Sequence, residues 1–219
     1  DGNYPVGTGN VALGNTALDS VEAGGTYNVA LGDAAGTAIT TGDGNVGVGA
    51  DALLLNSSGG YNTALGTSSV RNNTTGNYNV GLGQGALYSN TTASNNTAVG
   101  YQALFDNTTA ERNTAVGRLA AANTTTGADN TAMGSAALTT NTTGATNIAI
   151  GASALRLNTT ASNNTAVGFE AGYANTGDKN TFVGNEAGVA NTSGRLNTML
   201  GRRAGKSNTT ASSNTFVGQ

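Results

Sequence analysis

The 219-residue chain contains no cysteine, histidine or tryptophan and only one proline. Without cysteine and histidine, a disulfide scaffold is excluded, as are the usual zinc, copper and haem sites and catalysis by a thiol or an imidazole. Charged residues make up 10% of the chain and the net charge is -3, so we expect no nucleic-acid partner. No apolar run approaches the roughly 20 residues that cross a bilayer. We therefore expect no membrane insertion, no metal and no cofactor.

Four residue types dominate the sequence instead. There are 34 glycines, 30 asparagines, 35 threonines and 35 alanines, which together account for 134 of the 219 residues. This composition is unlike that of an average globular domain and directs attention to internal repeats. Thirteen copies of the box Asn-x-x-x-Gly recur in a common register, and ten of the twelve intervals between their asparagines are 17 residues. The box asparagines are Asn10, Asn28, Asn45, Asn62, Asn79, Asn96, Asn113, Asn130, Asn147, Asn164, Asn180, Asn197 and Asn214.

Each repeat follows a fixed pattern when its box asparagine is numbered position 1. Position 2 is Val, Ile or Thr, position 4 is aliphatic or Met, and position 5 is Gly in all thirteen boxes. This alternation predicts a short strand that ends at the glycine. Position 8 is Ala in eleven of twelve repeats and position 9 is often Leu, which we interpret as a second short strand. From position 12 onwards the residues are typical of turns.

Seventeen residues rich in Gly, Asn and Thr cannot form the helix pairs of common helical repeats. The pattern predicts an all-β fold, a parallel β-solenoid or β-roll of about twelve 17-residue coils, stacked about 4.8 Å apart. Residues 10–219 form its single repeat domain, and residues 1–9 form an irregular edge or truncated coil. Stacking places like positions in columns. The box asparagines then either form a hydrogen-bonded ladder or serve as turn residues in a left-handed conformation.

Two patterns support these columns. Position 3 is large only in the last three boxes, where Phe182, Met199 and Phe216 follow Gly172, Gly188 and Gly205 at position 9 of the preceding repeats. We interpret this exchange as volume compensation in a packed interior, although Gly36 is followed by no such enlargement. Arg112 and Asp129 are 17 residues apart, so we expect them to stack on adjacent coils.

The core of one coil is expected to be thin, because it consists of the residues at positions 2 and 4, one or two alanines and a leucine. Lateral association, for example in a homotrimer, would bury more apolar surface. Residues 1–70 carry six acids and no base, whereas residues 187–219 carry four bases and no acid. This asymmetry suggests head-to-tail stacking into a filament, with Arg202 and Arg203 as candidate contacts. Drift in surface charge is the alternative explanation.

The nine-residue segment Asn96-Thr-Ala-Val-Gly-Tyr-Gln-Ala-Leu104 and its copies resemble the head repeats of trimeric autotransporter adhesins. They are still more similar to shaft repeats of phage and bacterial tail-fibre-like proteins. The resemblance covers nearly the whole chain, from Asn10 to Gly218. It implies a trimer of parallel β-rolls that is located outside the cell, at a cell surface or on a virion fibre.

The uniformity of the repeats favours a non-enzymatic extracellular structural fibre, as a shaft or filament subunit whose partner is itself. The alternative is an adhesin or receptor-binding fibre head that recognises surface glycans. Tyr27, Tyr61 and Tyr78 each precede a box asparagine and so belong to one column, where they could stack on sugars or cover an apolar edge. Glu170 and Glu186 share position 7 on neighbouring coils. They could form a glycosidase-like carboxylate pair or part of a solvated charge ladder that continues to Arg203.

Many turns also contain the N-glycosylation sequence Asn-x-Ser/Thr, which would place one sequon per coil on the outside of the molecule. The alternative is that Asn-Thr is simply a favourable turn sequence. The candidate glycosylation sites are Asn56, Asn73, Asn90, Asn107, Asn123, Asn141, Asn158, Asn191 and Asn208.

Overall fold

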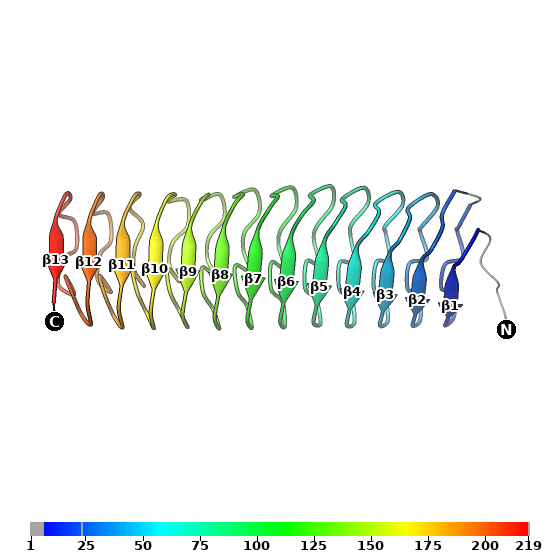
Figure 1. Ribbon diagram of the computed structural model, residues 1–219, viewed down its shortest axis with the longest axis horizontal. Coiled ribbons are helices and arrows are strands. Elements are labelled where there is room, and N and C mark those ends of the chain that lie inside the picture. The colour runs from blue at the N-terminus through cyan, green and yellow to red at the C-terminus, as the bar shows by residue number, and fades with distance from the viewer. Residues whose placement is uncertain (1–6, 23, 219) are drawn as a thin grey trace. The chain divides into compact units, whose positions relative to one another are not determined.

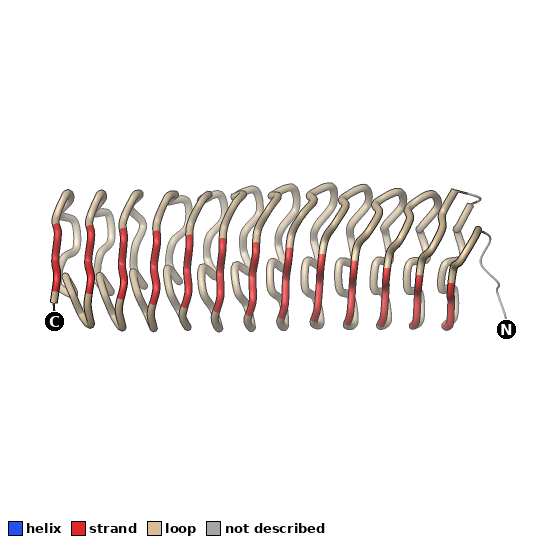
Figure 2. The backbone as a smooth tube through the Cα atoms, viewed as in Figure 1, coloured by secondary structure: helices blue, strands red, loops and turns tan. Residues whose placement is uncertain are grey.

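The computed structural model describes residues 7–22 and 24–218, in which one three-residue strand recurs in every repeat. The chain divides into two compact units, Asp1–Glu111 and Arg112–Gln219. The first unit contains β1 (Val11–Leu13), β2 (Val29–Leu31), β3 (Val46–Val48), β4 (Thr63–Leu65), β5 (Val80–Leu82) and β6 (Thr97–Val99). The second contains β7 (Thr114–Val116), β8 (Thr131–Met133), β9 (Ile148–Ile150), β10 (Thr165–Val167), β11 (Thr181–Val183), β12 (Thr198–Leu200) and β13 (Thr215–Val217). Between the strands the described chain consists of turns and loops (Figure 2), and it has no helix that could span a membrane.

Within each unit, every strand pairs in parallel with the strand of the next coil (Figure 1). The register joins like positions, as in Val46 opposite Thr63 in the first unit. It is kept across the 16-residue repeat, where Thr165 lies opposite Thr181. The predicted all-β parallel β-solenoid is therefore confirmed. The expected irregular edge at residues 1–9 falls largely outside the described residues, because residues 1–6 are not among them.

The glycine at position 5 is required by the close approach of successive coils. Gly49 has a φ of +129°, and a Cβ atom added to it would lie 2.7 Å from the carbonyl carbon of Gly66 in the next coil. The same collision with the backbone of the next coil would occur at most other box glycines, whereas Gly218, in the last described coil, has nothing within 4 Å of its Cβ position.

The strand residues are oriented differently from our expectation. Positions 2 and 4 do not enter the core, because only position 3 points inward; in β4, Ala64 is fully buried whereas Leu65 is 51% exposed. The reason is the narrow interior of each coil. A Cβ atom added to Gly47 would already lie 3.4 Å from both the Ala52 carbonyl oxygen and Leu53 Cδ1. An alanine at position 3 fits against positions 8 and 9, but a large side chain at position 3 fits only where a neighbouring residue at position 9 is small.

The second strand that we expected at positions 8 and 9 does not form. Positions 7 and 9 adopt left-handed backbone conformations, as in Asp51 (φ 57°) and Leu53 (φ 56°), so this segment turns instead of extending. The turn still buries Ala52 and Leu53 completely. Its backbone also bonds to the next coil, since Leu53 N donates to the Ser69 carbonyl oxygen at 3.1 Å.

The contacts in the last coils are those expected for volume compensation. Phe182 and Met199 are fully buried at position 3. A Cβ atom added to Gly172 would lie 2.5 Å from Phe182 Cδ2, and one added to Gly205 would collide with Met199 Sδ. Phe182 and Met199 thus fill the space that the glycines leave at position 9, whereas Phe216, in the last described strand, is 36% exposed and fills no such space.

The exceptions in the sequence pattern have similar explanations. A Cβ atom on Gly36 would lie 2.9 Å from Ile39 Cδ1 and 3.0 Å from Leu18 Cδ2, so Ile39 fills the space left at Gly36. Ser69 replaces the usual alanine at position 8, opposite Gly81, and its hydroxyl donates to the Gly81 carbonyl oxygen at 2.8 Å.

Candidate functional site

The box asparagines form a buried ladder along the interior of each unit. Asn62 Nδ2 donates to Asn45 Oδ1 at 3.1 Å and to the Gly76 carbonyl oxygen at 2.9 Å. Asn62 Oδ1 in turn accepts hydrogen bonds from the backbone N–H of Asn79 at 2.9 Å and from its side-chain amide at 3.1 Å. The same backbone N–H to Oδ1 bond recurs through both units. No described box asparagine has positive φ, so the ladder interpretation is confirmed and the turn interpretation is not.

A second asparagine ladder lies at position 12, where the sequence suggested only turn residues. Asn73 is fully buried, and its Nδ2 donates to Asn56 Oδ1 at 2.6 Å and to the Gly76 carbonyl oxygen at 2.9 Å. The carbonyl of Gly76 therefore accepts from both ladders. The ladder consists of Asn56, Asn73, Asn90 and Asn107 in the first unit and of Asn141, Asn158, Asn175, Asn191 and Asn208 in the second.

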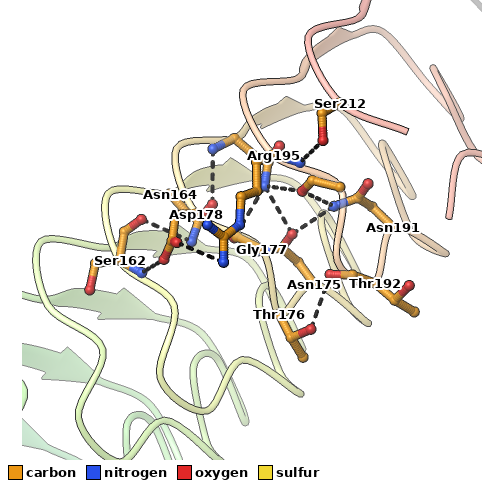
Figure 3. Close-up of polar contacts among 12 residues, drawn as sticks. Ser162, Asn164, Asn175, Thr176, Gly177, Asp178, Asn191, Thr192, Arg195 and Ser212 are labelled. Atoms are coloured by element: carbon orange, nitrogen blue, oxygen red, sulfur yellow. Dashed lines mark hydrogen bonds and ion pairs between the residues drawn. The ribbon is translucent and has the colours of Figure 1, made fainter. Parts of the chain in front are cut away.

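The second ladder is interrupted where a repeat departs from the pattern. Among the described residues, the buried side-chain atoms without a hydrogen-bond partner are Asn107 Oδ1 and Asn158 Oδ1. The repeat after Asn107 carries Thr124 at the corresponding position. After Asn158 comes the 16-residue repeat, in which Asn175 Nδ2 donates to Gly177 O at 2.8 Å instead (Figure 3).

The candidate glycosylation sites mostly belong to this second ladder. In eight of the nine sequons the asparagine Nδ2, the atom to which a glycan would be attached, donates a hydrogen bond to the carbonyl oxygen three residues later. Asn123 differs, because its side chain is exposed. The placement favours a structural role for the sequons, and glycosylation itself stays a prediction.

The outward side chains at positions 2 and 4 of β1–β13 form what we call the strand face. It consists of two columns per unit, with Val, Ile or Thr at position 2 and Leu, Val, Ile or Met at position 4. Its most exposed members are Val11, Leu13, Leu65, Met133, Ile148, Ile150, Leu200 and Val217. Aliphatic side chains aligned in exposed columns make a contiguous apolar surface, which is typical of an association site.

The charged residues form ion pairs between adjacent coils. Arg112 Nε lies 2.7 Å from Asp129 Oδ1, which confirms the predicted stacking, and this hydrogen bond lowers the pKa of Asp129. Arg203 Nε lies 2.7 Å from Glu186 Oε2 and lowers the pKa of that carboxyl. This ion pair is the contact expected of the charge ladder, and a catalytic pairing of Glu186 with Glu170 stays a prediction.

The two arginines proposed as end-to-end contacts lie at the last described coil. Arg202 is exposed, whereas Arg203 is held by Glu186. Both line an open hollow of about 710 Å³ together with Lys206 and Phe216. Its lining combines three basic side chains with one aromatic ring, which suits an acidic surface more than a small neutral ligand.

Three tyrosines share position 17 of the first unit. The rings of Tyr61 and Tyr78 stack with centroids 5.3 Å apart and an interplanar angle of 4°. Tyr27, Tyr61 and Tyr78 are 66%, 58% and 59% exposed, so they lie on the surface and cover little of the core.

No protein-family profile, curated protein or solved structure matches this chain. The resemblance to adhesin head repeats and tail-fibre shaft repeats therefore stays a prediction. Inferences about function rest on the geometry of the ladders, the strand face and the tyrosine column.

Proposed function

We propose that the protein is a non-enzymatic structural subunit of an extracellular fibre, at a cell surface or on a virion, whose copies associate laterally as a homotrimer. The strand face carries this proposal, because it is the broad apolar surface that the solenoid leaves uncovered. Parallel copies present the same two columns with the same repeat, so a contact made by one coil is repeated by every coil.

The available area is sufficient for such an interface. Complete burial of one aliphatic side chain removes roughly 60–120 Å² of apolar surface from water. The seven strands of the second unit present fourteen outward side chains, many of which are about half exposed. Burying them would remove on the order of 600 Å² from water, close to the roughly 800 Å² per partner of a typical specific interface.

A structural role also fits the interior. Within each unit the box ladder and the interrupted second ladder couple adjacent coils, which favours stiffness along the coil axis. Glu186, one of the two glutamates that share position 7 on neighbouring coils, is held by Arg203. These features support a spacer or linking function over an enzymatic one.

The oligomeric state tests the proposal. Light scattering after size-exclusion chromatography is expected to give three times the 21.4 kDa chain mass. The double variant Leu65→Lys/Val99→Lys places two charges on the strand face of the first unit and is expected to dissociate the trimer. Thr75→Lys, on an exposed turn, is the matched control. A monomeric wild-type protein at high concentration would refute lateral association.

Head-to-tail stacking between the acidic and basic parts of different copies is the second element of the proposal. Replacing Arg202 and Arg203 by Glu should shorten or abolish filaments in electron micrographs, more visibly at low salt because screening is weaker there. Filaments of unchanged length would exclude this contact.

A second candidate function is that of a fibre head that binds surface glycans. The observation that favours it is the column of three exposed tyrosines, since aromatic side chains aligned on a surface are characteristic of ligand-binding sites. Capture of a glycan from a printed panel by the whole protein would support this function.

A further inference from the structure

The tyrosine column contains one gap. Position 17 is occupied in chain order by Gly9, Tyr27, Gly44, Tyr61 and Tyr78. Tyr61 and Tyr78 lie on adjacent coils, and their rings are stacked. Tyr27 and Tyr61 are two coils apart, because the coil between them carries Gly44 and contributes no ring. From Tyr27 to Tyr78 the column therefore has four levels and three rings.

The rings on either side of the gap are placed in the same way. A Cβ atom added to Gly9 would lie 2.7 Å from Tyr27 Cδ1 and 3.0 Å from Cε1. A Cβ atom added to Gly44 would lie 2.9 Å and 3.0 Å from the same two atoms of Tyr61. Each ring thus lies over the glycine of the preceding coil. The level between them is the one that a side chain at position 44 would occupy.

The gap has the width of one six-membered ring. Coils in a parallel sheet are about 4.8 Å apart, so two steps separate the Tyr27 and Tyr61 rings by about 10 Å. A ring inserted midway would have its centre about 5 Å from each tyrosine. This separation lies in the range of stacked rings and is close to the 5.3 Å between Tyr61 and Tyr78.

A carboxylate lies next to the gap. Asp43 directly precedes Gly44, and its Oδ1 accepts hydrogen bonds from the backbone N–H and the hydroxyl of Thr26, both at 2.7 Å. Asp43 Oδ2 has no hydrogen-bond partner among the described residues. We take this second oxygen as the candidate acceptor for a hydroxyl group of a ligand held between the tyrosines.

We infer that the space between Tyr27 and Tyr61 is a binding site for one pyranose ring of a glycan. The two phenol faces would contact the C–H groups of the sugar, and Asp43 would accept a hydrogen bond from one of its hydroxyl groups. A flat aromatic ligand would use the tyrosines but not the carboxylate. The inference rests on the second candidate function above and assigns it a site.

The decisive variant fills the gap with the residue that the column already uses. Gly44 has a φ of +64°, and Tyr27, Tyr61 and Tyr78 adopt 57–58° at the same position, so the backbone at Gly44 is compatible with tyrosine. The Cβ atom of Gly44→Tyr would lie 2.9 Å from Tyr61 Cδ1, so the Tyr61 ring must shift slightly to admit it, as the stacked Tyr78 ring already does above Tyr61. The probe is a printed panel of neutral and acidic pyranose oligosaccharides. Tyr101→Ala is the matched control, because Tyr101 is an exposed tyrosine outside the column.

We expect the wild-type protein to capture at least one glycan of the panel. Gly44→Tyr and Tyr27→Ala should each weaken that capture at least tenfold, whereas Tyr101→Ala should leave it unchanged. Circular dichroism and the melting temperature would show that each variant remains folded. If a captured glycan binds Gly44→Tyr as well as it binds the wild type, the site is wrong but the glycan-binding function stands. If no glycan is captured, both are refuted, and the structural role is unaffected.

Discussion

Replacing Asn62 by Ala removes one rung from the box ladder and tests how much the ladder contributes to stability. The side chain is fully buried and takes part in four hydrogen bonds. Two are donated by its Nδ2, to Asn45 Oδ1 and to the Gly76 carbonyl oxygen. The other two are accepted by its Oδ1, from the backbone and side chain of Asn79.

Asn62→Ala leaves only some of the hydrogen-bond partners of Asn62 unsatisfied. Asn45 Oδ1 still accepts from the backbone N–H of Asn62 at 3.0 Å, and Gly76 O still accepts from Asn73 Nδ2 at 2.9 Å. The backbone N–H of Asn79 loses its partner inside the coil. An unsatisfied buried donor costs about 1–3 kcal/mol, and each of the other lost bonds contributes about 0.5–1.5 kcal/mol. Together these contributions lower the expected free energy of unfolding by about 2.5–7.5 kcal/mol.

Urea unfolding followed by far-UV circular dichroism measures this change. Hydrogen exchange with mass spectrometry would show whether protection is lost around residues 45–79, since repeat proteins can open locally. Asn72→Ala is the control in the same coil, because that half-buried amide receives one hydrogen bond from the exposed side of the molecule, from Arg71. We expect the control to change stability by less than about 0.5 kcal/mol. Equal effects of the two variants would refute the idea that the ladder holds the coils together.

Three further predictions follow from individual contacts. Gly172→Ala should lower stability by about 1–3 kcal/mol in thermal unfolding, because the added methyl group collides with Phe182. Adding Phe182→Ala should offset part of that loss. If the stability losses of the two single variants simply add in the double variant, the contact is contradicted. Arg112→Ala should raise the pKa of Asp129 toward its ordinary value in a carbon-13 NMR titration. The pKa of Asp129 is lowered in the folded protein, so the ion pair stabilises the fold at pH values above the ordinary carboxyl pKa. This stabilisation is lost as the pH falls through the lowered pKa. The stability difference between wild type and Arg112→Ala should therefore vanish in acid. The intact mass of the purified protein should be near 21.4 kDa, because the Nδ2 atoms of eight sequons are hydrogen-bonded within the coil; a heavier, heterogeneous mass would contradict this placement.

The repeat length and the box were sufficient to predict the coil, the parallel register and the first ladder. The reason is that stacking of identical coils imposes the same constraint at every level. Gly49 and its equivalents must lack a side chain, and Asn45 and its equivalents must hydrogen-bond upward and downward. Such constraints leave an invariant residue in the sequence, and an invariant residue at a fixed interval can be interpreted without coordinates.

The direction of the strand side chains and the second ladder could not be predicted in the same way. Alternation alone shows that Thr63 and Leu65 share one face but not which face is inside; the exchange of size between position 3 and the glycines at position 9 was the signal for the inward face, and our expectation for positions 2 and 4 did not use it. The apolar character of the residues at positions 2 and 4 predicted the wrong face, because the interior is too narrow for residues larger than Ala64. The asparagines at position 12 resembled ordinary turn residues, and Ile39 and Thr124 interrupt their column. The gap at Gly44 could not be recognised from that residue alone, because it is defined by the tyrosines that the fold places on the neighbouring coils.

The absence of cysteine permits a direct test of one coil per 17 residues. In the first unit Thr75, Thr92 and Thr109 are exposed on successive turns. Residues on adjacent coils have Cα atoms about 4.8 Å apart, within the 4.4–6.8 Å range of disulfides, whereas residues two coils apart are about 10 Å apart. Under mild oxidation, Thr75→Cys/Thr92→Cys should form an intramolecular disulfide and Thr75→Cys/Thr109→Cys should not. Failure of the first pair, or equal oxidation of both, would contradict the stacking of these repeats as coils of a solenoid.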